Sequence, residues 1–232
     1  MRKNILIWGM GTIYNKNVNI LKYFELKKQI KVVAITSNDS YKIQEIDGYQ
    51  ICDKKEVQLL EIDYIIVMND NYFEDIVKDI IELGYERRQI IHYRILNIPQ
   101  IDFDEYISLK ESNISIISNN CWGEIIYHTL ALECLSPFKN LSVGCKEYIE
   151  ILKNFHRYMS FELKFKKFLL EPHSHIMYPV MDLGGIEIHC NHDTDPDIAK
   201  EKWKRRVKKI NQKIYFMKCI QKVMKMQINF VV

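Results

Sequence analysis

The sequence lacks the features that mark most specialised classes of protein. Its 232 residues include six cysteines, but there is no C-x-x-C pair and no regular spacing between them. Neither a zinc ribbon nor a disulfide framework is therefore predicted, and reduced thiols fit best. No run approaches the roughly 18 apolar residues of a membrane-spanning helix. The apolar run behind the basic N-terminus is also shorter than the core of a signal peptide, so we expect a cytoplasmic protein without a transmembrane segment.

A large charge of one sign is also absent. The formal net charge is only +3, which is too small to indicate a nucleic-acid-binding protein. The basic residues do crowd one stretch near the C-terminus: Lys200, Lys202, Lys204, Arg205, Arg206, Lys208, Lys209 and Lys213. Such a run is typical of a solvated helix face, and it also suits an anionic group such as a diphosphate or a lipid headgroup. Nucleic acid is not expected as a partner, because no interleaved aromatic residues offer a stacking platform.

Hydrophobic residues make up 47% of the chain, which is enough for the core of one large soluble domain or two small ones. Near the N-terminus, an apolar run over 4–8 leads into Gly9-Met10-Gly11-Thr12-Ile13-Tyr14, which is the order of a nucleotide-binding strand and turn. Gly9 permits the tight turn, and Gly11 lets the backbone approach a pyrophosphate at the start of a helix. Tyr14 stands where a third glycine is usual, so the motif is degenerate.

Strands and helices are predicted to alternate at short spacing along this half. The expected strands span 4–8, 30–36, 49–52, 64–68 and 90–93, and the expected helices span 17–28, 54–60 and 72–83. Such alternation is typical of a parallel, doubly wound sheet, so we predict a Rossmann-like α/β domain over residues 1–98. Asp39 follows the second strand, where a ribose-binding acid would lie. Asn69 follows the fourth strand, where it either reaches a ligand or caps the next helix.

The ligand of this domain stays open between several classes. A nucleotide or a nucleotide-sugar fits the expected turn, and the candidate binding residues are Gly9, Gly11, Asp39 and Asn69. NAD(P) is less favoured, because only the degenerate glycine motif speaks for it. A fold that is kept for packing alone is the remaining alternative.

Residues 99–113 form the predicted connection to a second α/β domain over 114–232. Pro99 ends the first pattern, a short helix follows up to Glu111, and the connection contains no glycine or serine tract. We therefore expect the two halves to pack against each other, with the crevice between them as the default binding place.

A short apolar strand leads into the most informative segment of the second domain, Ser118-Asn119-Asn120-Cys121-Trp122-Gly123. Ligands of open α/β sheets bind outside the carboxyl ends of strands, and this run offers amides, a thiol and a stacking ring. The same residues also suit a scaffold, in which the asparagines form a turn and a helix begins at the glycine. That helix is predicted over 124–132, with Glu124, Tyr127 and His128 on one side. Glu124 can then orient His128 as a base, or the two form a simple surface pair.

This segment is followed by a second one, Ser136-Pro137-Phe138-Lys139-Asn140-Leu141. Together they match a pattern that reads roughly S-N-N-C-x-G-G-x-x-Y and then S-P-x-x-N-L. On these residues the chain resembles the bacterial domain of unknown function 1919, often labelled exopolysaccharide biosynthesis protein, from about 114 to 211. Glu124 stands in the place of the second glycine, which argues against a phosphate cradle lined by backbone alone. The family's W-x-R-R and R-x-N positions are matched in part, by Trp203, Arg205, Arg206 and Asn211.

The first half is similar to nucleotide-binding modules that stand in front of sugar-modifying transferases of surface-glycan pathways. This likeness rests on the run I-W-G-M-G and on the order of the expected elements. It implies a module that binds a nucleotide-sugar or a dinucleotide, or one that binds no ligand.

Histidines gather at the tip of a strand predicted over 186–193. The tip carries His189 and His192, and a helix capped by Thr194 or Asp195 follows, with Pro196 in its first turn. Metal-ligand types occur here and in the pair His173 and His175, yet neither spacing is a recognised site, so no metal is predicted.

The other elements expected in the second domain are a short strand over 140–143, one or two helices over 145–168 and a last strand over 213–220. Aromatic residues at helical spacing are expected to form the core of the 145–168 segment: Tyr148, Phe155, Tyr158, Phe161, Phe165 and Phe168.

The resemblance implies a transferase, or a transferase-like protein, in the biosynthesis of a bacterial surface polysaccharide, acting on a small-molecule or glycan substrate that carries a nucleotide or phosphate. Either a glycosyl- or an acyltransferase fits. His128 or His189 is then the general base toward a sugar hydroxyl, and Cys121 is a covalent nucleophile or a structural thiol. The candidate substrate-binding residues, with the arginines on phosphate, are Asn119, Asn120, Trp122, Tyr127, Asn140, His192, Arg205 and Arg206. The alternative is a noncatalytic nucleotide- or glycan-binding scaffold of the same pathway.

Overall fold

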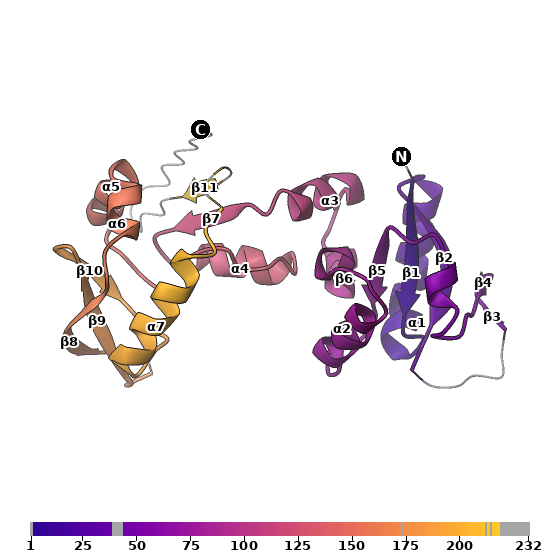
Figure 1. The fold of residues 1–232 in the computed structure, drawn as a ribbon, viewed down its shortest axis with the longest axis horizontal. Helices are drawn as coiled ribbons and strands as arrows, with labels where there is room; N and C mark the ends of the chain where they lie inside the picture. Colours follow the sequence, from indigo (N-terminus) through magenta and orange to yellow (C-terminus); the bar gives the residue numbers. More distant parts are fainter. Residues whose placement is uncertain (1, 39–43, 173, 212, 214, 219–232) are drawn as a thin grey trace. The chain divides into compact units, whose positions relative to one another are not determined.

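The computed structural model describes residues 2–38, 44–172, 174–211, 213 and 215–218 (Figure 1). The chain forms two compact units, Met1–Glu111 and Ser112–Val232. The predicted connection over 99–113 contains helix α3 (Phe103–Glu111), whose contacts group it with the first unit. In the described part of the chain, no helix is long and apolar enough to cross a membrane.

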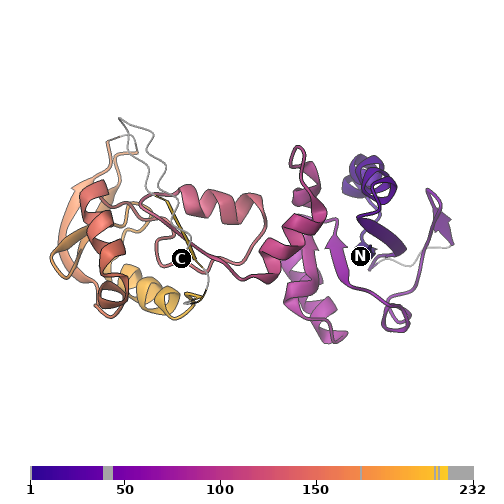
Figure 2. The same cartoon turned by 90° about the horizontal axis from the view of Figure 1, so that it is seen from above.

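A four-stranded parallel sheet forms the centre of the first unit. In spatial order its strands are β2 (Ile30–Thr36), β1 (Lys3–Trp8), β5 (Tyr64–Val67) and β6 (Ile90–His92). The chain runs from β1 through α1 (Thr12–Leu26) to β2, and from β5 through α2 (Phe73–Glu82) to β6. These two crossovers lead in opposite directions from the centre, so right-handed connections place α1 and α2 on opposite faces of the sheet (Figure 2). The predicted α/β class with a parallel sheet is confirmed.

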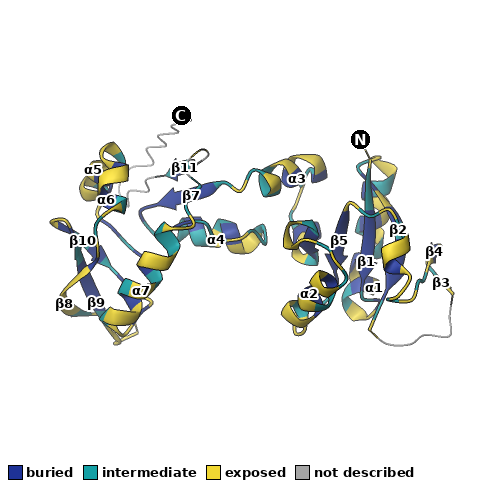
Figure 3. Cartoon of the chain, in the orientation of Figure 1, coloured by how far each residue is buried: buried dark blue, intermediate teal, exposed yellow. Residues whose placement is uncertain are grey.

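The two central strands are apolar along their length because both of their faces are covered. All four residues of β5 and the last four of β1 are buried (Figure 3). Helix α2 packs Ile76, Val77 and Ile80 into the same cluster as Leu6 and the Trp8 ring. Strands β1 and β5 are parallel neighbours, so their carboxyl ends lie side by side. From β1 the chain continues to one edge of the sheet and from β5 to the other, so the direction of the connections reverses between these two strands.

Three predicted elements of the first unit are wrong in extent. The helix expected over 17–28 is α1, which begins five residues earlier, at Thr12, and ends at Leu26. The strand expected over 49–52 is only β4 (Tyr49–Gln50), which pairs with β3 (Glu45–Ile46) in a small antiparallel ribbon. The helix expected over 54–60 is a single 3-10 turn, Val57–Leu59. Val57 is its one buried residue, so this segment has too little apolar surface to hold a longer helix against the sheet.

The second unit contains a short parallel pair and an antiparallel sheet. The parallel pair is β7 (Ser115–Ser118) with β11 (Tyr215–Lys218), and α4 (Trp122–Thr129) follows β7. The antiparallel sheet has the order β10 (Ile186–His189), β9 (Met177–Leu183) and β8 (Lys164–Leu170). The remaining helices are α5 (Cys145–Lys153), α6 (Phe155–Met159) and α7 (Pro196–Val207). As predicted, Asp195 caps α7, since its side chain accepts a hydrogen bond from the Asp197 N–H, and Pro196 is in the first turn.

The prediction that 145–168 is helical with an aromatic core is wrong in its last part. Phe155 and Tyr158 are buried on α6, but Phe165 and Phe168 lie on β8 and are 44% and 42% exposed. Strand β8 is at the edge of its sheet and pairs only with β9, so its side chains are covered by few neighbours. The strand expected over 140–143 is also reduced, to a single bridge between Ser142 and His189.

Candidate functional site

The junction between β7 and α4 carries most of the predicted site residues. The Ser118 hydroxyl donates to the Asn120 carbonyl oxygen at 2.7 Å and accepts the Gly123 N–H at 3.0 Å. The Asn120 side-chain oxygen accepts the Trp122 N–H, also at 3.0 Å. Two of the first amides of the helix are therefore satisfied by side chains of the same loop. These two amides are therefore engaged within the chain itself.

Gly123 permits the close approach of α4 to the end of β7. A Cβ atom at this position would lie 2.8 Å from the Ser118 hydroxyl oxygen and 3.4 Å from Ile116 atoms. The next residue, Glu124, stands where the family pattern has a second glycine. Its carboxylate forms an ion pair with Lys139 at 3.1 Å.

Asn119 and Tyr127 lie inside the packing of the second unit. They are only 4% and 3% exposed. The Tyr127 hydroxyl accepts the Ile116 N–H at 2.6 Å and donates to the Ile114 carbonyl at 3.1 Å, which fastens α4 to β7. The Asn119 amide nitrogen lies 3.5 Å from the Val143 carbonyl oxygen. Both side chains therefore form hydrogen bonds with backbone groups of their own unit.

Cys121 meets a histidine from a distant part of the sequence. Its Sγ lies 3.4 Å from Nε2 of His192, although 71 positions separate the two residues. The segment at 142–143 brings them together, because it pairs with the end of β7 on one side and the end of β10 on the other. The Val143 N–H donates to the Asn119 carbonyl at 3.0 Å, and Ser142 exchanges two backbone hydrogen bonds with His189 at 2.9 Å.

The Cys121 thiol stays protonated near neutral pH. Burial raises its pKa above the usual value, and the nearby Glu124 carboxylate raises it further. A thiol in this state is a poor nucleophile until a base removes its proton. The imidazole of His192, which is exposed in the turn after β10, is within reach for that role.

His189 is held in a more enclosed position than His192. Its Nδ1 lies 3.1 Å from the Tyr178 hydroxyl oxygen, and its Nε2 lies 4.0 Å from a Glu187 carboxylate oxygen. Burial lowers the pKa of His189, so the neutral imidazole is favoured. The other predicted base, His128, is on the exposed side of α4, and its expected partner Glu124 is bound to Lys139.

Glu187 should titrate at an unusually low pH. Lys167 and Lys166 each hold its carboxylate at 3.0 Å, and their hydrogen bonds lower the pKa of Glu187 to about 2. A carboxyl whose pKa falls on folding stabilises the fold above its ordinary pKa of 4.5, and this contribution is lost as the pH falls toward about 2. We expect a carboxyl ¹³C titration at low salt to give a midpoint near that value.

The measurement has an internal control. High salt should move the Glu187 midpoint upward, because both lysine side chains are nearly half exposed and their charges are screened. Replacing Lys166 and Lys167 with glutamine should restore an ordinary midpoint. A wild-type midpoint near 4.5 at low salt would show that the two ion pairs do not form in solution.

The other predicted substrate residues of the second unit lie around this junction or on α7. Lys218 Nζ is 4.0 Å from the centre of the Trp122 ring, a cation–π contact. Asn140 has a positive φ of 60° in the loop before Leu141. Arg206 donates to the Lys139 carbonyl at 2.8 Å, and burial lowers its pKa, whereas Arg205 is exposed. Of the two arginines, Arg205 is the one that faces solvent.

The glycine turn of the first unit has the strained geometry that glycine allows. Gly9 has a φ of +109°, and a Cβ there would lie 3.3 Å from the Met68 carbonyl oxygen. Gly11 is the N-cap of α1. Tyr14, in the place of the third glycine, is fully buried, and its hydroxyl donates to Asp47 at 3.0 Å. Asp39 lies outside the described residues.

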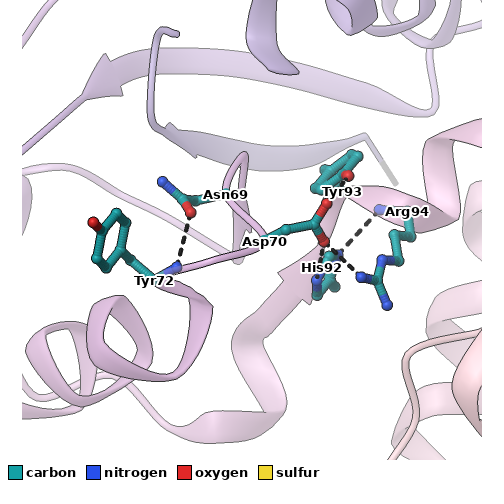
Figure 4. Close-up of polar contacts among 6 residues, drawn as sticks. All are labelled: Asn69, Asp70, Tyr72, His92, Tyr93 and Arg94. Carbon is teal, nitrogen blue, oxygen red and sulfur yellow. Dashed lines mark hydrogen bonds and ion pairs between the residues drawn. The ribbon is translucent and has the colours of Figure 1, made fainter. Parts of the chain in front are cut away.

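A polar cluster that the sequence analysis missed occupies the carboxyl ends of β5 and β6. Asn69 closes the turn before α2 there, since its side-chain oxygen accepts the Tyr72 N–H at 2.9 Å. Beside it, the side chains of three consecutive residues from the end of β6 converge on Asp70 (Figure 4): His92, Tyr93 and Arg94. The available signal was the pair of polar tips that follow two buried strands, because those tips meet at one edge of a parallel sheet.

A match over more than half of the chain decides the family. Residues 92–229 match the family described as domain of unknown function (DUF1919). The chain belongs to the DUF1919 family. Residues 1–91 match a second description, C2185-like, N-terminal, so the DUF1919 match begins at the end of β6.

One curated relative of this DUF1919 chain is an uncharacterized protein of Haemophilus influenzae (strain ATCC 51907 / DSM 11121 / KW20 / Rd). The two are 31% identical over 102 residues, which cover 44% of this chain and 47% of the relative. The chain thus spans about half the length of the curated relative that it matches.

Two solved dehydrogenase structures are similar to parts of the DUF1919 chain. UDP-D-quinovosamine 4-dehydrogenase from Vibrio fischeri has a TM-score of 0.33 and 19% identity, and covers 47% of this chain and 87% of its own. D-galactose-1-dehydrogenase from Rhizobium etli has a TM-score of 0.29 and 14% identity, and covers 81% and 70%. At these TM-scores neither enzyme's activity extends to this chain.

Within the described part of this DUF1919 chain, no three histidine, cysteine or acidic side chains gather as a metal site. Asp193, next to His192, forms an ion pair with Lys202. His173 lies outside the described residues. What the second unit brings together is a thiol and an imidazole, which is the pairing that nucleophilic catalysis uses.

Proposed function

We propose that this DUF1919 chain is a transferase of bacterial surface-polysaccharide biosynthesis in which Cys121 accepts the transferred group and His192 is the base. The observation that carries the proposal is the distance of 3.4 Å between the thiol sulfur and the imidazole Nε2. The resemblance of the S-N-N-C motif to exopolysaccharide biosynthesis proteins supports the pathway. A sugar hydroxyl on a nucleotide-linked or phosphate-containing glycan is the acceptor.

An acyl group is the group that a cysteine nucleophile is best suited to transfer. The thiol forms a thioester with it, and the thioester carbonyl stays reactive toward a second nucleophile. In the first step the Cys121 sulfur bonds to the carbonyl carbon of an acyl thioester donor while His192 Nε2 takes the thiol proton. The bond to the donor's sulfur breaks, and the departing thiolate takes that proton. In the second step a sugar hydroxyl attacks the Cys121 thioester, and its proton passes through His192 to the cysteine sulfur.

The raised pKa of Cys121 determines what the base must do. A thiol with a lowered pKa would attack without help, but this thiol is protonated when a donor arrives. Proton transfer to His192 must then accompany attack, as for a serine nucleophile. Arg205, exposed on α7, is available for the phosphate of the acceptor.

Intact-mass measurement of the purified chain with a series of short-chain acyl-coenzyme A donors tests the acyl step. We expect one acyl group to be added to wild-type protein, and peptide mapping should locate it on Cys121. Cys121→Ala should abolish the adduct. Cys145→Ala is the matched control, since Cys145 also stands at the start of a helix in this unit, and it should leave the adduct unchanged. An adduct that survives Cys121→Ala contradicts the assignment.

A noncatalytic nucleotide- or glycan-binding scaffold of the same pathway is the second candidate. The observation that favours it is that Asn119, Tyr127 and the first amides of α4 form hydrogen bonds within the chain. These groups then support the fold and do not bind substrate. Restoration of surface polysaccharide in a strain that lacks the chain separates the two. An enzyme requires Cys121 for restoration, whereas a scaffold carrying Cys121→Ala restores the polysaccharide fully.

A further inference from the structure

The first unit holds a carboxylate in the middle of three hydrogen-bond donors (Figure 4). Arg94 Nη2 lies 2.7 Å from one oxygen of Asp70, and the Tyr93 hydroxyl donates to the other. Nε2 of His92 lies 3.4 Å from the first oxygen. A guanidinium, a phenol and an imidazole that converge in this way form the set of donors with which proteins bind oxyanions.

The rings of His92 and Tyr93 and the backbone of Arg94 make contacts that do not involve Asp70. The His92 ring is 9% exposed and lies between two aromatic rings, 4.4 Å from Phe73 and 5.0 Å from Tyr93 between ring centres. Its Nδ1 accepts the Arg94 N–H at 3.3 Å, so the proton of the neutral imidazole is on Nε2, toward the carboxylate. The positions of the two rings are therefore set by the end of β6 and do not depend on Asp70.

Asp70 is a partly exposed anion at the centre of these donors. Its pKa is lowered, first by the hydrogen bond from Tyr93 and then by the charge of Arg94, so it is an anion at neutral pH. The Arg94 and Asp70 side chains are 43% and 35% exposed, so solvent reaches the pair. Ion pairs with this exposure contribute little to stability, and an incoming anion can exchange with the carboxylate.

The location also suits a ligand. The cluster lies at the carboxyl ends of β5 and β6, at the edge where open α/β sheets bind ligands, and Gly9 ends the neighbouring strand β1. Tyr72 stands at the same edge with 64% of its surface exposed, and the Asn69 side chain holds its N–H. An exposed aromatic ring at this edge offers a flat surface on which a planar group of a ligand can stack.

We propose that Arg94 and Tyr93 form a phosphate-binding site at this edge, and that Asp70 occupies it as an internal competitor until a phosphate-bearing ligand displaces it. The site joins the two matched regions of the sequence, because Asp70 belongs to the C2185-like match and Arg94 to the DUF1919 match. It is independent of the transferase proposal, since every residue of it lies in the first unit.

Isothermal titration of the full chain with inorganic phosphate and with uridine diphosphate tests the site. Asp70→Asn removes the competing charge while keeping the shape, and it should tighten binding of both probes about five- to tenfold. Adding Arg94→Gln to that variant should abolish the gain. In the Asp70→Asn protein, tighter binding of the nucleotide than of phosphate would assign the site to a nucleotide, and equal binding would assign it to the phosphate alone.

A second ion pair of the same unit is the matched control. Arg87 holds Glu74 through two hydrogen bonds at 2.9 and 3.2 Å, and both side chains are more than half exposed. Glu74→Gln should leave phosphate affinity unchanged. If Asp70→Asn does not fold, Arg94→Gln alone should weaken phosphate binding relative to wild type. The proposal is overturned if folded Asp70→Asn protein binds neither probe more tightly than wild type. Asp70 would then have only a structural role, connecting the segments that follow β5 and β6.

Discussion

Replacement of His192 with asparagine should slow acylation of Cys121 about 100- to 10,000-fold, the usual loss when a positioned base is removed. Asparagine keeps a polar side chain in the turn after β10 but cannot accept the thiol proton. Burial and the Glu124 carboxylate keep the pKa of that thiol above its usual value, so few thiolates exist without the base. The measurement is the rate of adduct formation by quenched intact-mass analysis.

The pH dependence of the remaining rate tests the role of His192 separately from its effect on folding. Without a base, attack depends on free thiolate, so the rate of His192→Asn should rise about tenfold per pH unit through the neutral and mildly alkaline range. The wild-type rate should rise less steeply with pH over the same range, because His192 takes the thiol proton during attack. A variant that is slow at every pH by the same factor would indicate lost positioning of Cys121.

The other two histidines provide the controls. The sequence alone nominates His128 and His189 as bases, and neither is the histidine that contacts Cys121. His128→Asn should leave acylation unchanged. His189→Asn removes the partner of the Tyr178 hydroxyl and should affect acylation only through the shape of the β10 end. A loss confined to His189→Asn would transfer the role of base to His189.

The parallel sheet of the first unit is predictable because each central strand is a short apolar run that ends in polar residues. Burial on both faces of β1 and β5 requires such runs, and they are visible without knowledge of the fold. Edge and irregular elements are not predictable in this way. Strand β8 alternates lysine with phenylalanine around a bulge, so neither helical nor strand periodicity is clean along it.

The Cys121–His192 contact depends on long-range pairing that no local pattern contains. It exists because Ser142 pairs with His189 and Val143 with Asn119, which places the turn after β10 beside the start of α4. The sequence shows that a thiol and several histidines are present, and only the register of these backbone contacts selects one of them. The Asp70 cluster is of the same kind, since its members come from the ends of two strands that are 20 or more positions apart.

Replacement of Tyr127 with phenylalanine should destabilise the second unit by about 2–4 kcal/mol, although only one oxygen is removed. That oxygen accepts the Ile116 N–H and donates to the Ile114 carbonyl, at 2.6 and 3.1 Å. A phenylalanine ring would fill the same space and leave two backbone groups of the β7 region without their partner. An unsatisfied buried group costs about 1–3 kcal/mol, which is more than the loss of a hydrogen bond open to water.

The same variant decides between the substrate contact predicted for Tyr127 and the structural role that its hydrogen bonds indicate. A residue that binds substrate would lower acceptor affinity when changed and leave the urea midpoint of the second unit nearly constant. A residue that fastens α4 to β7 would lower the midpoint, and acceptor affinity would be unchanged at temperatures where the variant is folded. Tyr178→Phe is the control, because its half-buried hydroxyl has a histidine partner and its loss should cost only about 0.5–1.5 kcal/mol. Tyr127 is 3% exposed and both of its hydrogen bonds go to the β7 region, so it should follow the second pattern. Substrate contacts then fall to groups that reach solvent, such as Cys121 and His192.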